Sequence, residues 1–125
     1  MPLSCHSAFV TIADPEIAPL VEFYRQILGF PPQIYQKQVY AEFQLGGFRL
    51  GIFKPKQTHE PEFANRARTG LSLCLEVENL DRAIAHLNQL GYPPPGEMIT
   101  PSHGREIYGC DPQGNRLILH EASHP

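Results

Sequence analysis

The chain has 125 residues, of which 42% are hydrophobic and 18% charged, so it is long enough to form one domain around a hydrophobic core. Its formal net charge of -3 gives no electrostatic reason to bind nucleic acid or an anionic membrane. No apolar run approaches the roughly 20 residues of a transmembrane helix, and Met1 to Ser7 lacks the order of a signal peptide, so we expect a cytoplasmic protein.

Cys5, Cys74 and Cys110 form an odd set without the C-x-x-C spacing of a zinc or redox site. Reduced thiols are therefore expected in place of a disulfide framework. No Gly-rich loop precedes a helix in the form that a nucleotide site requires, and no nucleophile elbow surrounds a serine or cysteine. The sequence predicts neither a nucleotide cofactor nor a catalytic triad.

The first elements predicted are a strand and a helix. Residues 6–12 alternate in the manner of a strand. Asp14 is then expected to cap a helix that has Pro15 at its first position and that ends at Gly29. Pro19 leaves the true start open by about one turn, because proline cannot donate a hydrogen bond inside a helix.

Three short runs follow the helix and predict a β-meander, over residues 34–36, 39–45 and 48–53. The next segment, residues 54–69, is polar, contains prolines and shows no periodic pattern. Such a segment is either a linker or a mobile loop beside a site. We favour a linker with some loop function.

The same order of elements then starts again. Residues 71–77 predict a strand, and Asn79 predicts the cap of a helix that ends at Gly91. Three further strands are expected over 98–100, 105–110 and 116–121. The last two flank residues 111–115 (DPQGN), which have the proline and glycine of a tight turn.

Short matches between the two halves indicate a duplication. Residues 28–32 (LGFPP) match residues 90–94 (LGYPP), and residues 47–50 (GFRL) match residues 114–117 (GNRL) in the same order. Elements that persist while their connections change in length are typical of a repeated unit. We therefore predict one domain made of two βαβββ modules, at about 4–53 and 70–121, joined by the loop 54–69.

Residues 22–30 (EFYRQILGF) and residues 111–115 (DPQGN) resemble motifs of the vicinal oxygen chelate superfamily. This superfamily includes glyoxalase I, bleomycin-resistance proteins, fosfomycin-resistance enzymes and extradiol dioxygenases. The resemblance implies an α+β fold in which two βαβββ modules form a cup-shaped mixed sheet flanked by helices. It also implies a homodimer, but fold membership alone names no reaction.

The resemblance further implies four positions at which metal-using members carry ligands. They correspond here to His6, Leu71, Gly51 and Ile118. Only His6 has a donor atom in its side chain, whereas a divalent ion needs three or four N, O or S ligands. We therefore expect no metal cofactor at the inherited site.

A replacement metal site is the less favoured alternative. His120 lies two residues beyond Ile118 and so on the same strand face, which would allow His6 and His120 to contribute two imidazoles. Glu76 or Glu121 would have to be the third ligand. Strand parity argues against both carboxylates, and ordinary hydrogen-bonded histidines remain the simpler interpretation.

A ligand-binding cup requires an apolar lining and a few polar groups. Gly51 would leave space, and guanidinium groups at matching positions of the repeat could bind an anionic ligand unless they are surface arginines. A second group around Gly104 is either a flap that touches the ligand or a solvated loop. The ligand-binding candidates are His6, Arg49, Gly51, His103, Arg105, Arg116, Ile118 and His120.

The function that these residues favour is metal-independent binding of a small molecule, similar in type to the bleomycin-resistance branch of the superfamily. One alternative is a metal-dependent lyase, isomerase, dioxygenase or thiol transferase. Another is a non-catalytic subunit whose cup has become a protein interface. Metal content and stabilisation by small molecules distinguish the three.

Overall fold

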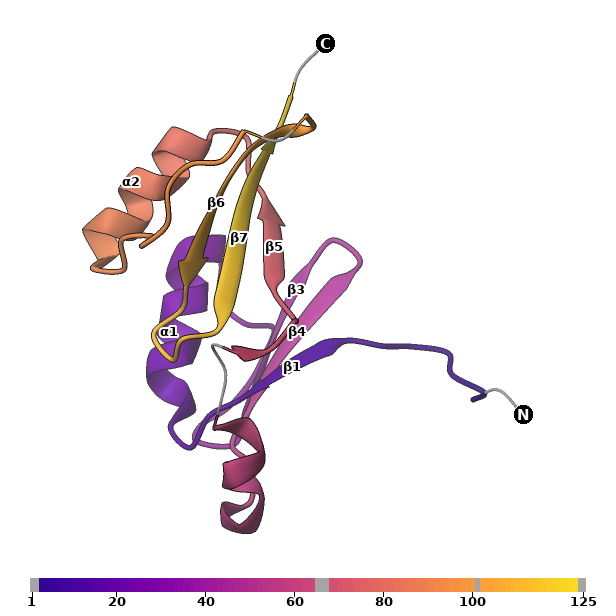
Figure 1. Cartoon of the computed structure of the whole chain (residues 1–125). Helices are drawn as coiled ribbons and strands as arrows, with labels where there is room; N and C mark the ends of the chain where they lie inside the picture. The colour runs from indigo at the N-terminus through magenta and orange to yellow at the C-terminus, as the bar shows by residue number, and fades with distance from the viewer. Residues whose placement is uncertain (1–2, 65–67, 101, 124–125) are drawn as a thin grey trace. The chain divides into compact units, whose positions relative to one another are not determined.

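The structure, a computed structural model, describes residues 3–64, 68–100 and 102–123. The chain forms two compact units, Met1–Phe63 and Ala64–Pro125. Each unit has one sheet and one α-helix of more than ten residues, which makes the protein α+β with two βαβββ-like modules (Figure 1). In the described residues, no helix is long and apolar enough to cross a membrane.

Unit 1 contains a four-stranded sheet in the order β1-β4-β3-β2. Strand β1 is parallel to β4, and the other neighbours are antiparallel. Helix α1 packs on β4 and buries an apolar stripe that includes Leu20 and Tyr24. The elements of unit 1 are β1 (Val10–Ala13), α1 (Ile17–Leu28), β2 (Ile34–Gln36), β3 (Tyr40–Leu45) and β4 (Phe48–Phe53).

Helix α1 begins later than the sequence predicted. Its N-cap is Glu16, and Asp14 instead accepts a hydrogen bond from the Glu16 backbone N–H at 3.1 Å. The start at Ile17 places Pro19 in the first turn, where backbone N–H groups have no partner inside the helix. Pro19 is tolerated in this first turn but not further inside the helix, so it limits how early the helix can begin. The expected start at Pro15 was wrong.

The segment after β4 is more regular than expected. A 3-10 helix, η1 (Gln57–Phe63), occupies much of the region that was predicted to be an unpatterned linker. Its last residue, Phe63, packs edge-on against Phe53 with ring centroids 5.8 Å apart. Residues 65–67 of that segment lie outside the described residues.

Unit 2 repeats the order of elements with a three-stranded sheet, β5-β7-β6. Strand β5 is parallel to β7, and β6 is antiparallel to it (Figure 1). The strand expected over residues 98–100 is reduced to one bridge between Ile99 and Glu106. The elements of unit 2 are β5 (Leu73–Glu76), α2 (Leu80–Leu90), β6 (Gly104–Cys110) and β7 (Arg116–Ala122).

Both ends of α2 confirm the sequence prediction. The Asn79 side chain accepts a hydrogen bond from the Arg82 backbone N–H at 3.0 Å, as an N-cap does. Gly91 ends the helix in the left-handed region, with a φ of 89°, which glycine adopts without steric cost.

The predicted turn between β6 and β7 is also confirmed. Asp111 Oδ1 accepts hydrogen bonds from the backbone N–H groups of Gln113 and Asn115, and Oδ2 accepts one from the Asn115 side chain. Gly114 has a φ of 87°. Because Asp111 is buried, its carboxylate depends on these bonds, and they fix the register of the hairpin.

Alternation along β7 separates a core face from a second face. Helix α2 packs on β7, and the buried side chains of Leu117 and Leu119 form the core face with Leu80 and Leu87 of the helix. Ile118 and His120 therefore point to the opposite side of the sheet.

Candidate functional site

The second face of the unit 2 sheet carries a mixed group of apolar and ionisable side chains, which we call the His120 face. Strand register places Glu76 of β5 and Glu106 of β6 on either side of His120. One step along the strands, Ile118 lies between its register partners on β5 and β6. The His120 face consists of Cys74, Glu76, Glu106, Tyr108, Ile118 and His120.

His120 is held by Glu76. Its Nδ1 lies 2.9 and 2.8 Å from the two carboxylate oxygens of Glu76. This hydrogen bond, followed by the negative charges of Glu76 and Glu106, raises the pKa of His120 above its usual value, although burial opposes the shift. The other ring nitrogen, Nε2, is buried, and the His103 backbone is a further partner of the ring that also raises its pKa.

The pairing of His120 with Glu76 corrects the parity argument made from sequence. In the sequence, Glu76 is out of phase with Leu71, which placed it on the other face of the strand. The parallel register of β5 and β7 instead aligns Glu76 directly with His120, so both side chains point to the same side. Glu121 is out of phase with His120, as expected, and lies on the helix side.

Two of the predicted flap residues contact different parts of unit 2. The His103 ring lies over His120 with centroids 4.8 Å apart, and its Nε2 is 3.7 Å from Glu106. Arg105 Nε instead donates to Glu121 Oε2 at 3.1 Å. His103 lies before the start of β6, so its side chain does not follow the in-and-out alternation of that strand. The side chains of His103 and Arg105 therefore point to different sides. The structure does not bring Arg105 to His120.

Glu121 and Arg105 support the start of α2. Glu121 Oε1 accepts a hydrogen bond from the Leu80 backbone N–H at 2.9 Å, and Arg105 also lies 3.5 Å from Asp81. A carboxylate at a helix N-terminus satisfies a free N–H group and interacts favourably with the helix dipole. Their observed role is therefore structural.

A separate polar cluster lies on one face of the unit 1 sheet. Glu42 of β3 is paired in register with Gly51 of β4, and its Oε1 accepts a hydrogen bond from the Tyr40 hydroxyl at 2.7 Å. The same oxygen is 3.7 Å from the Arg49 guanidinium. Burial, and then the bond to Glu42, raise the pKa of Tyr40 to about 12, so the phenol stays a donor.

The space expected above Gly51 is filled. A Cβ atom added at Gly51 would lie 2.7 Å from the Tyr40 hydroxyl and 3.1 Å from its ring carbon Cε1. Tyr40 therefore occupies the volume that a larger side chain at position 51 would need. Gly51 serves the packing of Tyr40, and the prediction of an open space at this position was wrong.

The two matching arginines make equivalent contacts in their own units. Arg49 Nη2 donates to Ser7 Oγ at 2.8 Å, and Arg116 Nη1 donates to Ser72 Oγ at 3.1 Å. Arg49 also lies over the Phe9 ring, 4.3 Å from its centroid. Ser7 directly follows His6, and Ser72 directly follows Leu71. His6 and Leu71 are the positions that the sequence analysis matched to metal-ligand positions.

His6 and Leu71 differ from the serines in their surroundings. Both are exposed. A shift of one residue along an extended chain reverses the side to which a side chain points. Sequence reasoning thus missed the serines by one residue.

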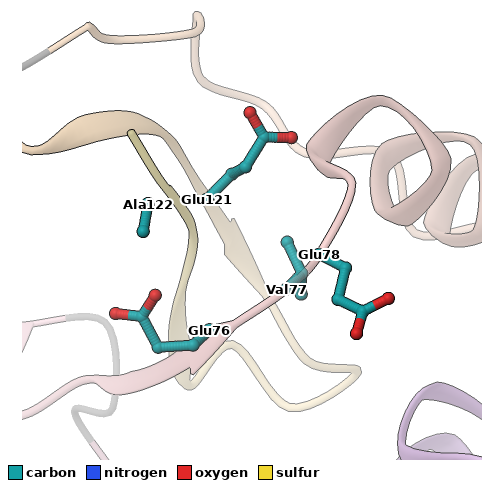
Figure 2. Close-up of a pocket in the computed structure, with 5 residues that line it drawn as sticks. All are labelled: Glu76, Val77, Glu78, Glu121 and Ala122. Atoms are coloured by element: carbon teal, nitrogen blue, oxygen red, sulfur yellow. The ribbon is translucent and has the colours of Figure 1, made fainter. Parts of the chain in front are cut away.

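An open hollow of about 410 Å³ lies beside the ends of β5 and β7 (Figure 2). Figure 2 shows the carboxylates of Glu76, Glu78 and Glu121 pointing in different directions. Glu76 is paired with His120 and Glu121 with Arg105. These carboxylates do not converge on a common point, so the hollow does not form a cation site.

The residues present do not fit a divalent metal at the inherited positions. Ile118 has no donor atom, and Tyr40 fills the volume at Gly51. Across residues 3–64, 68–100 and 102–123, no three His, Cys, Asp or Glu side chains are grouped to hold an ion. The ionisable side chains of the His120 face can form hydrogen bonds and exchange protons.

Several residues of these two faces were not identified from sequence as ligand-binding candidates. Two of them are register partners of predicted candidates, Glu42 of Gly51 and Glu106 of His120, so pairing every candidate with its cross-strand neighbours would have found these two. The others are connected through side-chain hydrogen bonds, Tyr40 to Glu42 and the two serines to the matching arginines. The missed residues are Ser7, Tyr40, Glu42, Ser72 and Glu106.

Comparison with protein families gives one match that covers most of the chain. The model described as "Glyoxalase/Bleomycin resistance protein/Dioxygenase superfamily" matches residues 6–119. Comparison with curated proteins finds no significant match.

Solved structures of the same fold span nearly the whole chain. A glyoxalase/bleomycin resistance protein from Catenulispora acidiphila is 25% identical, with a TM-score of 0.68 over 93% of this chain and 97% of that one. A protein from Agrobacterium tumefaciens is 22% identical, with a TM-score of 0.76 over 96% and 99%. A fosfomycin resistance protein from Listeria monocytogenes, solved with Mn(II) and sulfate, is 19% identical, with a TM-score of 0.72 over 98% and 93%.

Proposed function

Because the chain belongs to the glyoxalase/bleomycin resistance protein/dioxygenase superfamily, we propose that it binds a small molecule without a metal ion. In this proposal the protein sequesters or senses its ligand and does not convert it. The observation that carries the proposal is the His120 face, where an oriented histidine lies beside apolar side chains.

The make-up of the His120 face supports binding of an organic ligand. Ile118 and Tyr108 are apolar neighbours in register, and Tyr108 is 45% exposed. Small-molecule sites combine such apolar surface with a few polar groups that orient the ligand. His120 is such a group, because the Glu76 carboxylate fixes the orientation of its ring.

The metal-dependent alternatives have less support. Lewis-acid catalysis requires several donor side chains around one ion. Two of the positions used by metal-dependent members carry Gly51 and Ile118 here, and Tyr40 fills the space at the first. The Listeria protein with Mn(II) is 19% identical, so its likeness concerns the fold alone.

Thermal unfolding in the presence of EDTA tests the proposal. Across a panel of small organic molecules, we expect at least one compound to raise the Tm, because a ligand at 100 times its Kd adds about 2.7 kcal/mol to the free energy of unfolding. Stabilisation that appears only with a divalent metal would contradict it. So would a stoichiometric ion, in untagged protein, that is lost in His6→Ala and His120→Ala variants.

We further propose that the protein is a homodimer. Strand β2 is an edge strand with exposed apolar side chains at Ile34 and Tyr35, and such edges favour pairing with another chain. Light scattering coupled to size exclusion should give twice the chain mass, and Ile34→Lys with Tyr35→Lys should give the monomer mass. A monomer that forms a stable hetero-complex on pull-down would favour the protein-interface alternative.

A further inference from the structure

The side chain of Met98, in the segment between α2 and β6, is in contact with Arg105 and with solvent. Met98 is 40% exposed, so small oxidants can reach its thioether. The sequence has two methionines, and the other is Met1. An oxygen atom gained by the interior of the chain at methionine is therefore assigned to Met98 without ambiguity.

Strand pairing fixes the backbone next to this contact. Ile99 and Glu106 exchange two backbone hydrogen bonds, each 2.8 Å from nitrogen to oxygen. Met98 directly precedes Ile99, and Arg105 directly precedes Glu106. The bridge therefore brings the Met98 and Arg105 side chains together, and Arg105 Nη1 donates to Met98 Sδ at 3.6 Å.

Arg105 uses the other edge of its guanidinium for Glu121. Nε and Nη2 each lie 3.1 Å from a carboxylate oxygen of Glu121, which also accepts the Leu80 N–H at the start of α2. Two parallel bonds to one carboxylate fix the plane of a guanidinium. Nη1 is thereby directed at the Met98 sulfur, which is only a weak acceptor.

Oxidation by hydrogen peroxide would turn this weak acceptor into a strong one. A bond forms between the sulfur and one peroxide oxygen while the O–O bond breaks, and the second oxygen leaves as water with the proton of the transferred oxygen. The sulfur loses two electrons, which the peroxide gains. Because Met98 is exposed, the polar sulfoxide need not be buried, and its oxygen suits a cationic donor.

We propose that Met98 is a reversible oxidation site whose sulfoxide oxygen accepts a hydrogen bond from Arg105 Nη1. Oxidation then ties the segment before β6 more firmly to β6 and, through Glu121, to the start of α2. Arg105 and Glu121 lie on the helix side of the sheet and not on the His120 face. The site therefore acts independently of ligand binding at that face.

Peroxide treatment followed by hydrogen exchange tests the site. Peptide mapping by mass spectrometry should show one added oxygen at Met98, which methionine sulfoxide reductases A and B together should remove. Dithiothreitol after the peroxide step returns oxidised thiols. NMR should then show exchange of the Ile99 backbone N–H about tenfold slower in the oxidised protein, the effect of one added hydrogen bond.

Three variants separate the sulfoxide contact from general effects of peroxide. Met98→Leu is the matched control, because it has no sulfur, and peroxide should leave its Ile99 exchange unchanged. Arg105→Lys keeps the positive charge but loses the fork, so oxidation should no longer slow the exchange. Met98→Gln places an amide oxygen near Nη1 and should slow the exchange without peroxide.

Three results would overturn the proposal. The first is a Met98 that stays unoxidised, or is not restored by the reductases, under conditions in which free methionine is oxidised and restored. The second is Ile99 exchange that is equal or faster after oxidation. The third is slowing that persists in Arg105→Lys. Should Arg105→Lys not fold, exchange in Met98→Gln that is no slower than in Met98→Leu overturns the proposal instead.

Discussion

At the scale of single residues, His120 and Glu76 define the ionisable centre of unit 2, and their pairing has a consequence for pH dependence. The pKa of His120 is raised in the folded protein, first by the hydrogen bond to Glu76. The pair therefore contributes its full stabilisation below the unfolded pKa of about 6.5 and loses it as pH rises through the folded value.

Replacing Glu76 with Gln tests this pH dependence. We expect a lower pKa for His120 in 15N NMR titration, because the carboxylate that favours the charged ring is gone. The stability advantage of wild type over Glu76→Gln in urea should shrink as pH rises through the folded pKa. Glu78→Gln is the matched control, and an equal effect of the two substitutions at every pH would contradict the pairing.

Gly51 and Tyr40 give a second prediction at this scale. Gly51→Ala places a Cβ atom where the Tyr40 hydroxyl lies, so the hydrogen bond from Tyr40 to Glu42 must break or shift. We expect a loss of roughly 1 to 3 kcal/mol in urea unfolding, since Glu42 is buried and loses a partner. Gly47→Ala, where an added Cβ meets no atom within 4 Å, is the control.

A double-mutant cycle shows whether Tyr40 transmits the effect of Gly51→Ala. In a Tyr40→Phe background the hydrogen bond is already absent, so the cost of Gly51→Ala should fall. Additive costs would show that the backbone, and not the Tyr40 side chain, resists the new Cβ. Nothing in the sequence indicated this contact, because it depends on the register of β3 against β4.

At the scale of elements, the start of α2 depends on a residue far along the chain. Glu121 of β7 accepts a hydrogen bond from the Leu80 N–H and forms an ion pair with Arg105 of β6. We expect Glu121→Ala to cost roughly 0.5 to 2 kcal/mol, the range for loss of a helix N-terminal partner. Hydrogen exchange at Leu80 should accelerate in Glu121→Ala, and equal exchange in both proteins would argue against this support.

The turn after β6 provides a second element-scale prediction. Asp111 accepts three hydrogen bonds from Gln113 and Asn115. Asp111→Ala should cost roughly 1 to 3 kcal/mol in urea unfolding, because the part-buried backbone N–H groups of Gln113 and Asn115 lose their acceptor. Asp111→Asn keeps Oδ1 and should lose less, and an equal loss in the two variants would show that the charge matters more than the backbone bonds.

Helix ends and turns were predictable from sequence because single residues determine them. Gly29 and Gly91 adopt a left-handed conformation that other residues rarely take, and Asn79 caps α2 as predicted. Strand starts were predicted less well. The first strand was expected from residue 6 but begins at Val10, since its extent depends on pairing with β4 and not on local alternation.

At the scale of the whole molecule, the repeat was the strongest sequence signal. The two units share an order of elements, and each ties an arginine at the start of its last strand to a serine, Arg49 to Ser7 and Arg116 to Ser72. The polar faces were less predictable. The unit 1 cluster combines residues from two strands and the His120 face from three, which single-strand parity does not reveal.

Metal dependence is also tested on the whole molecule. We expect untagged protein, purified without chelator, to contain less than stoichiometric Mn, Fe, Co, Ni, Cu or Zn in elemental analysis. EDTA should leave the Tm unchanged, because no inherited position other than His6 offers a donor atom. A fall in Tm on adding EDTA that is reversed by one of these ions would contradict this prediction.

The contact between Tyr40 and Gly51 also affects how the protein can evolve. Introducing a glutamate or histidine at position 51 would insert a side chain into volume that the phenol occupies, before any ion could compensate. The intermediate would be less stable than either end point unless Tyr40 changed first. Position 51 is thus closed to a metal-binding side chain unless position 40 changes as well.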